Sequence, residues 1–417
     1  MAHAELKLVR GVTVKGRPPP EGAALSALEE FAEQAASAQQ ASSHWDAFDF
    51  IIFSCAPPPR TASCRKPPPL RPVPLLSLAT ATPPFRLPQA EAKALSRDLF
   101  EGRKGLFERL SGVFDNAGIE GRDLVAPVDW YREPHGYESR NRLYLESSEA
   151  LFETAAAAAL ERAGLKASDI DGIVTVSTTG IATPSLEARV APRMGFRDNV
   201  RRVPLFGLGC AGGVGGLATA ARLAGSEPGS RWLFVTIETC SISIRLDSDD
   251  PASLVATALF GDGAAACVVG GAEGTGLATI TRAGERLWPD TLGIMGWRVE
   301  DPGFAVVFDR AIPPFITAEL NGAVAGLLAD FGREWSDIDR LCCHPGGAKV
   351  IQAIEEAMTL EPGTLDLERE VLRDHGNMSA PTVLFVLDRL LGRGLPNTVL
   401  MTAFGPGFTC AGMLLQR

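Results

Sequence analysis

The feature that limits the fold of this chain most strongly is an internal repeat with a nearly constant offset. The tetrapeptide Ser-Asp-Ile-Asp occupies residues 168–171 and again residues 336–339. Gly209-Cys210 and Gly376-Asn377 each open a segment of small residues, and we expect both segments to begin a helix. A third pair of apolar runs keeps the spacing: residues 233–236 and 399–402. Offsets of 166 to 168 residues across three elements predict two similar halves from an internal duplication.

The halves alternate between strand-like and helix-like segments. From Leu75 onward, short β-branched runs alternate with Ala- and Leu-rich runs, which is typical of a largely parallel sheet covered by helices. Residues 148–163 predict one such helix, capped by Ser148 and ended by Gly164. We therefore expect an α/β fold, with a first half at residues 76–270 and a second half at residues 271–417.

Residues 1–75 differ from the rest of the chain. They contain three Pro-Pro-Pro runs and no periodic strand pattern. This composition predicts a mostly disordered extension, with a wrongly chosen start codon as the alternative.

Composition and charge exclude several function classes. A formal charge of −10 disfavours a nucleic-acid or membrane-surface partner, because both bind basic faces. Eight cysteines without a Cys-x-x-Cys pair, and no secretory signal at the start, favour reduced thiols in a cytoplasmic protein. The longest apolar stretch, residues 205–223, is rich in Gly and carries Arg222, so it predicts a core helix rather than a stable membrane insertion.

Three chemically useful side chains converge if the repeat is real. Cys210 and Asn377 occupy equivalent turns, and His344 follows the apolar run at residues 341–343 in the second half. A helix start at Cys210 would lower the pKa of its thiol, although a buried structural cysteine is the alternative. Asn377 suits an amide donor to an oxyanion or a helix cap. Gly261–Gly263 lacks the context of a phosphate loop.

With these residues assembled, residues 76–417 resemble the type III polyketide synthases, the chalcone synthase superfamily. The resemblance is carried by five motifs: GCAGG around Cys210, ALFGDGAA at residues 258–265, HPGG at His344, GNMSAPTV at Gly376 and FGPG at Phe404. It implies a five-layered αβαβα thiolase-like fold, a homodimer, acyl loading on Cys210, and His344 and Asn377 as the other catalytic residues. It implies no metal and no cofactor, because acyl-CoA and malonyl-CoA are substrates.

The same resemblance suggests substrate-binding residues. The two gatekeeper phenylalanines of the family match Phe304 and, as a departure, Ile244, which favours a fatty acyl starter. Arg122 is the candidate for the CoA tail. Further matches line the cyclisation pocket, reach across the dimer interface or form the terminal glycine loop: Thr178, Thr179 and Gly180; Thr183; Gly405, Pro406 and Gly407.

The function that these residues predict is iterative decarboxylative condensation of malonyl-CoA onto an acyl starter, followed by closure to a pyrone or resorcinol. The pattern is closer to bacterial alkylpyrone and alkylresorcinol enzymes than to plant chalcone synthases. A ketoacyl-carrier-protein synthase III-like enzyme is the nearest alternative. A papain-like protease shares the order Cys, His, Asn but leaves the repeat unexplained, and a non-catalytic scaffold predicts an unreactive Cys210.

Overall fold

The computed structural model describes residues 70–99, 104–245, 250–272 and 276–417. The predicted extension lies outside the described residues except for residues 70–75. Those positions already belong to the core, because Leu70 and Val73 are buried and strand β1 begins at Val73. The folded part of the chain therefore begins before the predicted boundary at position 76, whereas the boundary between residues 270 and 271 stays a prediction.

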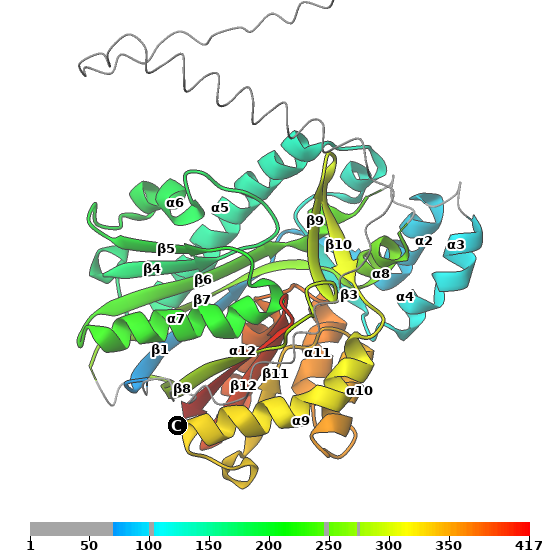
Figure 1. The fold of residues 1–417 in the computed structure, drawn as a ribbon. Coiled ribbons are helices and arrows are strands. Elements are labelled where there is room, and N and C mark those ends of the chain that lie inside the picture. The colour runs from blue at the N-terminus through cyan, green and yellow to red at the C-terminus, as the bar shows by residue number, and fades with distance from the viewer. Residues whose placement is uncertain (1–69, 100–103, 246–249, 273–275) are drawn as a thin grey trace, which may run out of the picture. The chain divides into compact units, whose positions relative to one another are not determined.

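The main sheet has nine strands, and its order repeats in the two halves of the chain (Figure 1). The first half supplies five neighbouring strands: β1 (Val73–Ala81), β7 (Asp262–Gly270), β6 (Arg231–Thr239), β4 (Gly172–Val176) and β5 (Arg201–Leu205). The second half supplies four: β8 (Ala278–Leu287), β13 (Thr409–Gln416), β12 (Thr398–Gly405) and β11 (Arg340–Cys343). The order β8-β13-β12-β11 repeats β1-β7-β6-β4, and β1 pairs with β8 to join the halves. The predicted duplication is confirmed.

The aspartate that ends the repeated tetrapeptide forms the same pair of hydrogen bonds in both halves, and we call this pair an aspartate bracket. The Arg231 amide donates to the Asp171 carboxylate at 2.9 Å, and the Asp171 amide donates to the Arg231 carbonyl at 2.8 Å. In the second half, the Thr398 amide donates to the Asp339 carboxylate at 2.8 Å, and the Asp339 amide donates to the Thr398 carbonyl at 3.0 Å. Each aspartate thus fixes the register of two parallel strands, β4 with β6 and β11 with β12.

The expectation of a largely parallel sheet is wrong. Strand β4 is parallel to β5 and β6, and β11 is parallel to β12, but the other five neighbouring pairs of the nine strands are antiparallel. The connection between β12 and β13 is a short turn, which permits only an antiparallel pair. The sequence pattern of buried strands does not distinguish the two arrangements, because strands covered on both faces are apolar in either direction.

Helices cover the sheet in three layers (Figure 1). The outer face of the first half is covered by α5 (Tyr137–Arg162) and α6 (Leu186–Met194). Between the two halves lie α7 (Gly212–Ser226) and α12 (Thr382–Arg393), each of which contacts strands of both halves. The outer face of the second half is covered by α9 (Ile312–Phe331) and α10 (Ala348–Ala357). Three buried apolar clusters fill the spaces between these layers, so the αβαβα order is the predicted one.

The helix predicted at residues 148–163 begins eleven residues earlier, at Tyr137. Ser148 is fully buried inside this helix instead of capping it. The buried stripe continues toward the N-terminus through Tyr144 and Arg140, whose polar ends hide the periodicity in the sequence. The predicted stop near Gly164 is correct, since α5 ends at Arg162.

Shorter elements flank the main sheet. They are two ribbons, β2 (Phe85–Pro88) with β3 (Gly121–Leu124) and β9 (Met295–Glu300) with β10 (Gly303–Phe308), the helices α2 (Gln89–Leu99), α3 (Lys104–Leu110), α4 (Gly112–Asn116), α8 (Pro251–Leu259) and α11 (Asp366–His375), and the turns η2 (Val128–Arg132), η3 (Ala167–Asp169), η4 (Gly209–Ala211), η5 (Cys240–Ser243) and η6 (Trp335–Asp337).

One described helix, α9, is long and apolar enough to cross a membrane. Its apolar side is used inside the protein, because Ile316, Leu320 and Leu327 are at most 1% exposed. These residues pack with the buried apolar cluster of the second half. The hydropathy of α9 is therefore that of a helix covering a sheet.

Candidate active site

Cys210 lies in the turn η4, directly before the first residue of α7. Its side chain is 7% exposed. The terminal glycine loop, residues 405–407, packs closely against this turn. A Cβ added at Gly405 would lie only 2.5 Å from the Leu208 carbonyl oxygen. A Cβ added at Gly209 would lie 2.6 Å from Pro406. Close backbone approach at these two glycines fixes the position of the thiol.

Asn377 lies in a loop rather than at a helix start. Helix α11 ends at His375, and α12 begins only at Thr382, so the expectation that Gly376-Asn377 opens a helix is wrong. Pro381 sets the later start, because the residue before a proline avoids the helical conformation. The Asn377 side chain is 1% exposed. Its amide nitrogen donates to the Gly346 carbonyl at 3.0 Å.

His344 follows β11 and is held by its own backbone, whose amide donates to the Thr402 carbonyl at 2.9 Å. The side chain is 4% exposed. Neither ring nitrogen has a hydrogen-bond partner among the described residues. A buried polar group without a partner is uncommon in folded proteins, so this imidazole is free to bind a substrate atom.

A chain of contacts links Cys210 to Asn377 and to the backbone near His344. The Cys210 thiol lies 3.5 Å from the Ser379 hydroxyl, and the Ser379 amide donates to the Asn377 side-chain oxygen at 2.8 Å. Asn377 in turn binds Gly346, two residues after His344. Ser379 was not among the predicted site residues, although it lies inside the GNMSAPTV motif, and its φ of 58° places it in the left-handed region. Backbone strain of this kind concentrates at functional sites.

Burial sets the protonation states of the site. It raises the pKa of the Cys210 thiol to about 12, and the charge of Glu238 acts in the same direction, while the Ser379 contact opposes the shift. Burial also lowers the pKa of His344 to about 3. The expected lowering of the thiol pKa is therefore wrong, because desolvation outweighs the helix start. Burial therefore favours the neutral thiol of Cys210 and the neutral imidazole of His344.

A small, mostly apolar cavity opens beside Cys210. We call it the Cys210 chamber, and twelve residues line it: Gly209, Cys210, Cys240, Phe260, Met295, Gly296, Trp297, Val306, Val307, Phe308, Ser379 and Pro406. Of the predicted substrate-binding residues, Pro406 lies in this wall. Gly405 does not line the chamber but packs against the backbone of the Cys210 turn, and Gly407 lies next to Leu287.

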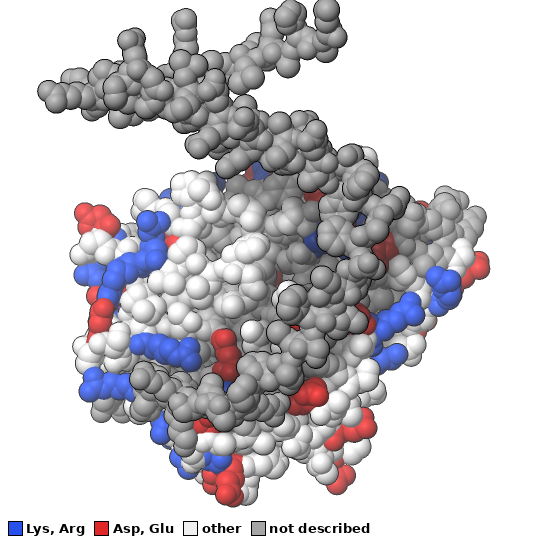
Figure 2. All heavy atoms as spheres, in the orientation of Figure 1, with Lys and Arg blue, Asp and Glu red and all other residues white. Residues whose placement is uncertain are grey.

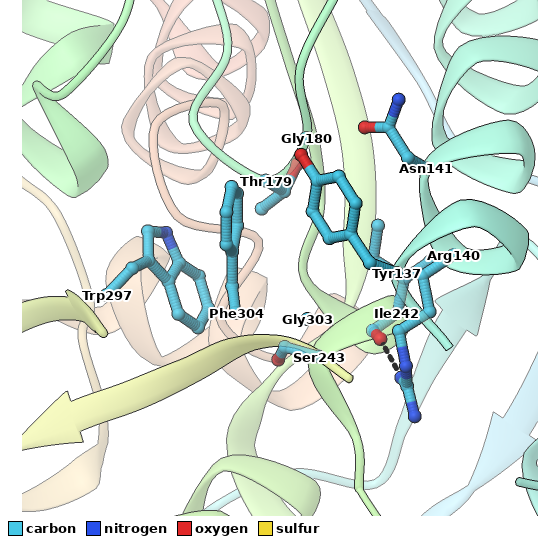
Figure 3. Close-up of a pocket in the computed structure, with 10 residues that line it drawn as sticks. All are labelled: Tyr137, Arg140, Asn141, Thr179, Gly180, Ile242, Ser243, Trp297, Gly303 and Phe304. Carbon is cyan, nitrogen blue, oxygen red and sulfur yellow. Dashed lines mark hydrogen bonds between the residues drawn. The ribbon is translucent and has the colours of Figure 1, made fainter. Parts of the chain in front are cut away.

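A second pocket shares Trp297 with the chamber, and its lining residues are drawn in Figure 3. We call it the Tyr137 pocket. Trp297 borders both cavities, and its ring stacks on Phe304 with centroids 6.2 Å apart. Figure 3 shows Phe304 between Trp297 and Tyr137, whose ring centroid lies 6.0 Å from that of Phe304. Three aromatic rings therefore fill much of the space in which a long acyl chain would lie.

The predicted pocket residues divide into two groups. Phe304, Thr179 and Gly180 line the Tyr137 pocket. Thr178 lies behind it, where its hydroxyl donates to the Glu238 carboxylate at 2.6 Å. Ile244 does not line it.

Two residues of the turn η5 line the Tyr137 pocket, Ile242 and Ser243. Ile244 packs in a separate buried apolar cluster, so its assignment as a gatekeeper is wrong. The Arg140 guanidinium binds the carbonyls of both Ile242 and Ile244, and this turn geometry decides which side chain faces the pocket.

Two further predicted residues have contrasting surroundings. Thr183 is exposed. Arg122 is 1% exposed and donates to Gln89 at 2.9 Å, so its burial contradicts the prediction that it binds the CoA tail. Among the described residues, no group of three or more His, Cys, Asp or Glu side chains could hold a metal ion.

Comparison with known proteins identifies the family of this chain. The family model for chalcone and stilbene synthases, N-terminal domain, matches residues 132–273, and the C-terminal domain model matches residues 279–417. The chain belongs to this family, the type III polyketide synthases, which are acyltransferases with the thiolase-like fold. Membership excludes the papain-like protease and places the chain apart from the ketoacyl-carrier-protein synthases.

Individual proteins of this family are similar to the chain over most of its length. A 1,3,6,8-tetrahydroxynaphthalene synthase of Streptomyces peucetius subsp. caesius is 38% identical over 345 residues, covering 81% of this chain and 91% of that protein. A putative chalcone synthase of Bacillus subtilis (strain 168) is 32% identical over 357 residues, covering 82% and 98%. The crystal structure of the 1,3,6,8-tetrahydroxynaphthalene synthase from Streptomyces coelicolor A3(2) has a TM-score of 0.78 and 30% identity, covering 82% of this chain and 99% of that one.

The raised thiol pKa predicts how Cys210 reacts with iodoacetamide. Because only the thiolate is alkylated, the rate will rise about tenfold per pH unit from pH 7 to pH 9, without a plateau. Peptide mass spectrometry measures the rate at Cys210, and Cys210→Ala identifies background labelling at Cys240 in the same chamber. A fast rate that is independent of pH between 6 and 8 would show a thiolate–imidazolium pair and contradict this assignment.

Proposed function

We propose that Cys210 accepts an acyl group from an acyl-CoA and that malonyl-CoA then extends it by decarboxylative condensation. The observation that carries this proposal is the buried imidazole of His344, which has no hydrogen-bond partner among the described residues and lies two residues before Gly346, whose carbonyl binds the side chain of Asn377. A donor pair in a dry site suits an enolate oxygen, because such donors strengthen where water is excluded.

Loading begins from the neutral pair. As the sulfur of Cys210 attacks the thioester carbonyl, its proton passes to His344. The carbon–sulfur bond to CoA then breaks, and the departing CoA thiolate takes that proton. The products are the acyl-Cys210 thioester and free CoA, and His344 is neutral again.

Extension uses the same neutral imidazole in another way. The malonyl thioester carbonyl accepts hydrogen bonds from His344 and from the amide proton of Asn377 that Gly346 does not use. Carbon dioxide leaves, and the electron pair of the broken carbon–carbon bond forms the enolate. The enolate carbon attacks the acyl-Cys210 carbonyl, and the Cys210 thiolate leaves, ready for transfer of the lengthened chain.

We propose a short starter rather than a fatty acyl group, and ring-forming condensation rather than pyrone formation. The argument for a fatty starter used Ile244 as an open gate, and Ile244 lies outside the pocket. Trp297, Phe304 and Tyr137 occupy the space that a long chain needs. Some relatives are described as 1,3,6,8-tetrahydroxynaphthalene synthases, and the compound in that name bears oxygen on alternate carbons, as condensation of two-carbon units gives.

We also propose that two copies associate through the ends of β4 and β5. Ile181 and Phe206 follow these paired strands and are 42% and 58% exposed. Thr183, expected to reach into the neighbouring subunit, lies in the same loop as Ile181. Figure 2 shows an uncharged area of the surface near β5 and α6, with charged residues toward its margins. Exposed apolar side chains such as Ile181 and Phe206 on an uncharged surface are typical of an interface.

We propose the cytoplasm as the compartment. The six cysteines among the described residues are all free and buried, including Cys342 and Cys343, which are neighbours in sequence. Reduced thiols persist where glutathione and thioredoxin operate. This supports the expectation made from the sequence.

Replacing the donor and the nucleophile separates the two steps. Asn377→Ala should lower kcat for malonyl-CoA decarboxylation by about 10² to 10³, the usual effect of removing one oxyanion donor. Cys210→Ala should abolish product formation but retain decarboxylation. Release of labelled carbon dioxide and mass spectrometry of products measure the two steps. Near-normal decarboxylation by folded Asn377→Ala would refute the role of the amide.

Opening the wall between the cavities tests the starter. Trp297→Gly should raise kcat/KM for octanoyl-CoA relative to acetyl-CoA by at least about tenfold, because a larger apolar pocket gains contacts with each added methylene. Trp335→Gly removes a tryptophan outside both pockets and should leave the ratio unchanged. If the wild-type enzyme already prefers octanoyl-CoA, the short-starter proposal fails.

A charge in the proposed interface tests the dimer. Phe206→Asp should convert a particle of twice 44.2 kDa into a monomer, because an aspartate is costly to bury there. Phe85→Asp changes another exposed phenylalanine, in β2, and should leave the mass unchanged. Light scattering measures both. A wild-type monomer, or a dimer that survives Phe206→Asp, would contradict the proposed interface.

A further inference from the structure

Arg122 is a buried cation outside the walls of both cavities. It lies in β3, is 1% exposed and donates to the Gln89 side chain at 2.9 Å and to the Phe260 carbonyl at 3.4 Å. Gln89 donates onward to the Ala258 carbonyl at 3.1 Å. Burial lowers the pKa of Arg122 to about 10, and Asp262 opposes the shift, so the side chain stays charged at neutral pH.

These bonds meet at the C-terminal end of α8, where three successive carbonyls need partners from outside the helix. Gln89 binds the carbonyl of Ala258, and Arg122 binds that of Phe260. The middle carbonyl, of Leu259, accepts from the backbone amide of Asn377 at 2.8 Å. A cation at this end of a helix also complements its dipole. Arg122 therefore completes the helix end on which the backbone of Asn377 rests.

The segment that carries Asn377 is held from both sides. The Gly261 amide donates to the Asn377 carbonyl at 3.0 Å. A Cβ added at Gly261 would lie 3.1 Å from the Cβ of Arg122, and one added at Gly376 would lie 3.5 Å from it. Arg122 thus packs directly behind the glycines that flank this pairing, and a shift of its side chain changes the space available to both.

The strand that bears Arg122 also binds the end of α11, which leads into Asn377. The Glu120 amide donates to the Arg373 carbonyl at 2.8 Å, just before β3 begins. The Asp123 carboxylate lies 3.2 Å from Nδ1 of His375. The path from β3 to Asn377 is therefore short and made of direct contacts.

We infer that Arg122, supported by Gln89, is a positioning residue that sets the carboxamide of Asn377 for decarboxylation of the malonyl group. Without the guanidinium, the Phe260 carbonyl and Gln89 lose a buried partner, and the end of α8 relaxes together with the Asn377 backbone. Displacements of about 1 Å at a donor cost up to about a hundredfold in rate. The inference rests on the proposed function of Asn377.

The test compares four variants in the malonyl-CoA decarboxylation assay. Arg122→Met and Gln89→Leu should lower kcat by roughly tenfold to a hundredfold with KM within about twofold. Arg122→Lys, which keeps a charge and a donor, should recover part of the loss. Arg197→Met removes a more exposed arginine that binds a carbonyl, as Arg122 does, and also a carboxylate, just before β4, and should behave as wild type.

Two further measurements separate positioning from loss of structure. The rate of Cys210 alkylation should be unchanged in Arg122→Met, whereas hydrogen exchange at residues 259–261 and 376–378 should accelerate. Wild-type kcat in a folded Arg122→Met variant, or an equal loss in decarboxylation and in Cys210 accessibility, would overturn the inference. If Arg122→Met does not fold, Gln89→Leu decides by the same criteria.

The wild-type enzyme and Asn377→Ala are assayed together with these variants. If neither the wild-type enzyme nor any variant releases carbon dioxide, the proposed function has failed, and exchange at residues 376–378 still reports whether Arg122 holds the loop. If Asn377→Ala loses activity while both Arg122→Met and Gln89→Leu retain it, only the positioning inference has failed.

Discussion

The site depends on one backbone pairing between the two halves of the chain. Asn377, in the second half, donates to Leu259 and accepts from Gly261, both in the first half. Cys210 belongs to the first half and His344 to the second, so their relative position is fixed only where the halves touch. The glycine loop at Gly405, which packs closely against the Cys210 turn, is a second contact of this kind near the site. Substitutions at either contact alter the site without touching substrate.

The chemistry follows from how completely these contacts exclude water. A thiol pKa of about 12 instead of 9.0 corresponds to roughly 4 kcal/mol against the thiolate of Cys210. A helix N-terminus returns only about 0.3–1 kcal/mol in ordinary geometries. Burial therefore has the larger effect on the pKa of Cys210, and burial also favours the neutral form of His344. A neutral imidazole retains a proton to donate to an enolate, so the dry site that disfavours a resting thiolate favours the decarboxylation step.

The internal repeat allowed the architecture to be predicted. The aspartate bracket fixes two parallel strands in each half, and because the same hydrogen bonds need the same residues, the tetrapeptide recurs in the sequence. Strand direction elsewhere was not predictable from buried apolar runs. The three candidate catalytic residues could be found because each lies within two residues of the end of a strand or helix. Arg122 and Ile244 could not be placed, because their surroundings come from distant segments. Arg122 donates a hydrogen bond to Gln89, which lies in another element. The direction in which the Ile244 side chain points depends on Arg140, whose guanidinium binds the Ile244 carbonyl.

The wall between the two cavities has a different origin from the rest of the site. Trp297 and Phe304 both lie on the ribbon β9–β10, which pairs with no strand of the main sheet. A two-stranded ribbon has little stability of its own, and this one is also tied to the turn after η5 by the ion pair of Arg245 with Glu300. The candidate catalytic residues are therefore built on the duplicated core, while a separate element supplies part of the walls of both cavities. Under the proposed function, substitutions in the ribbon change the cavity volume without touching Cys210, His344 or Asn377.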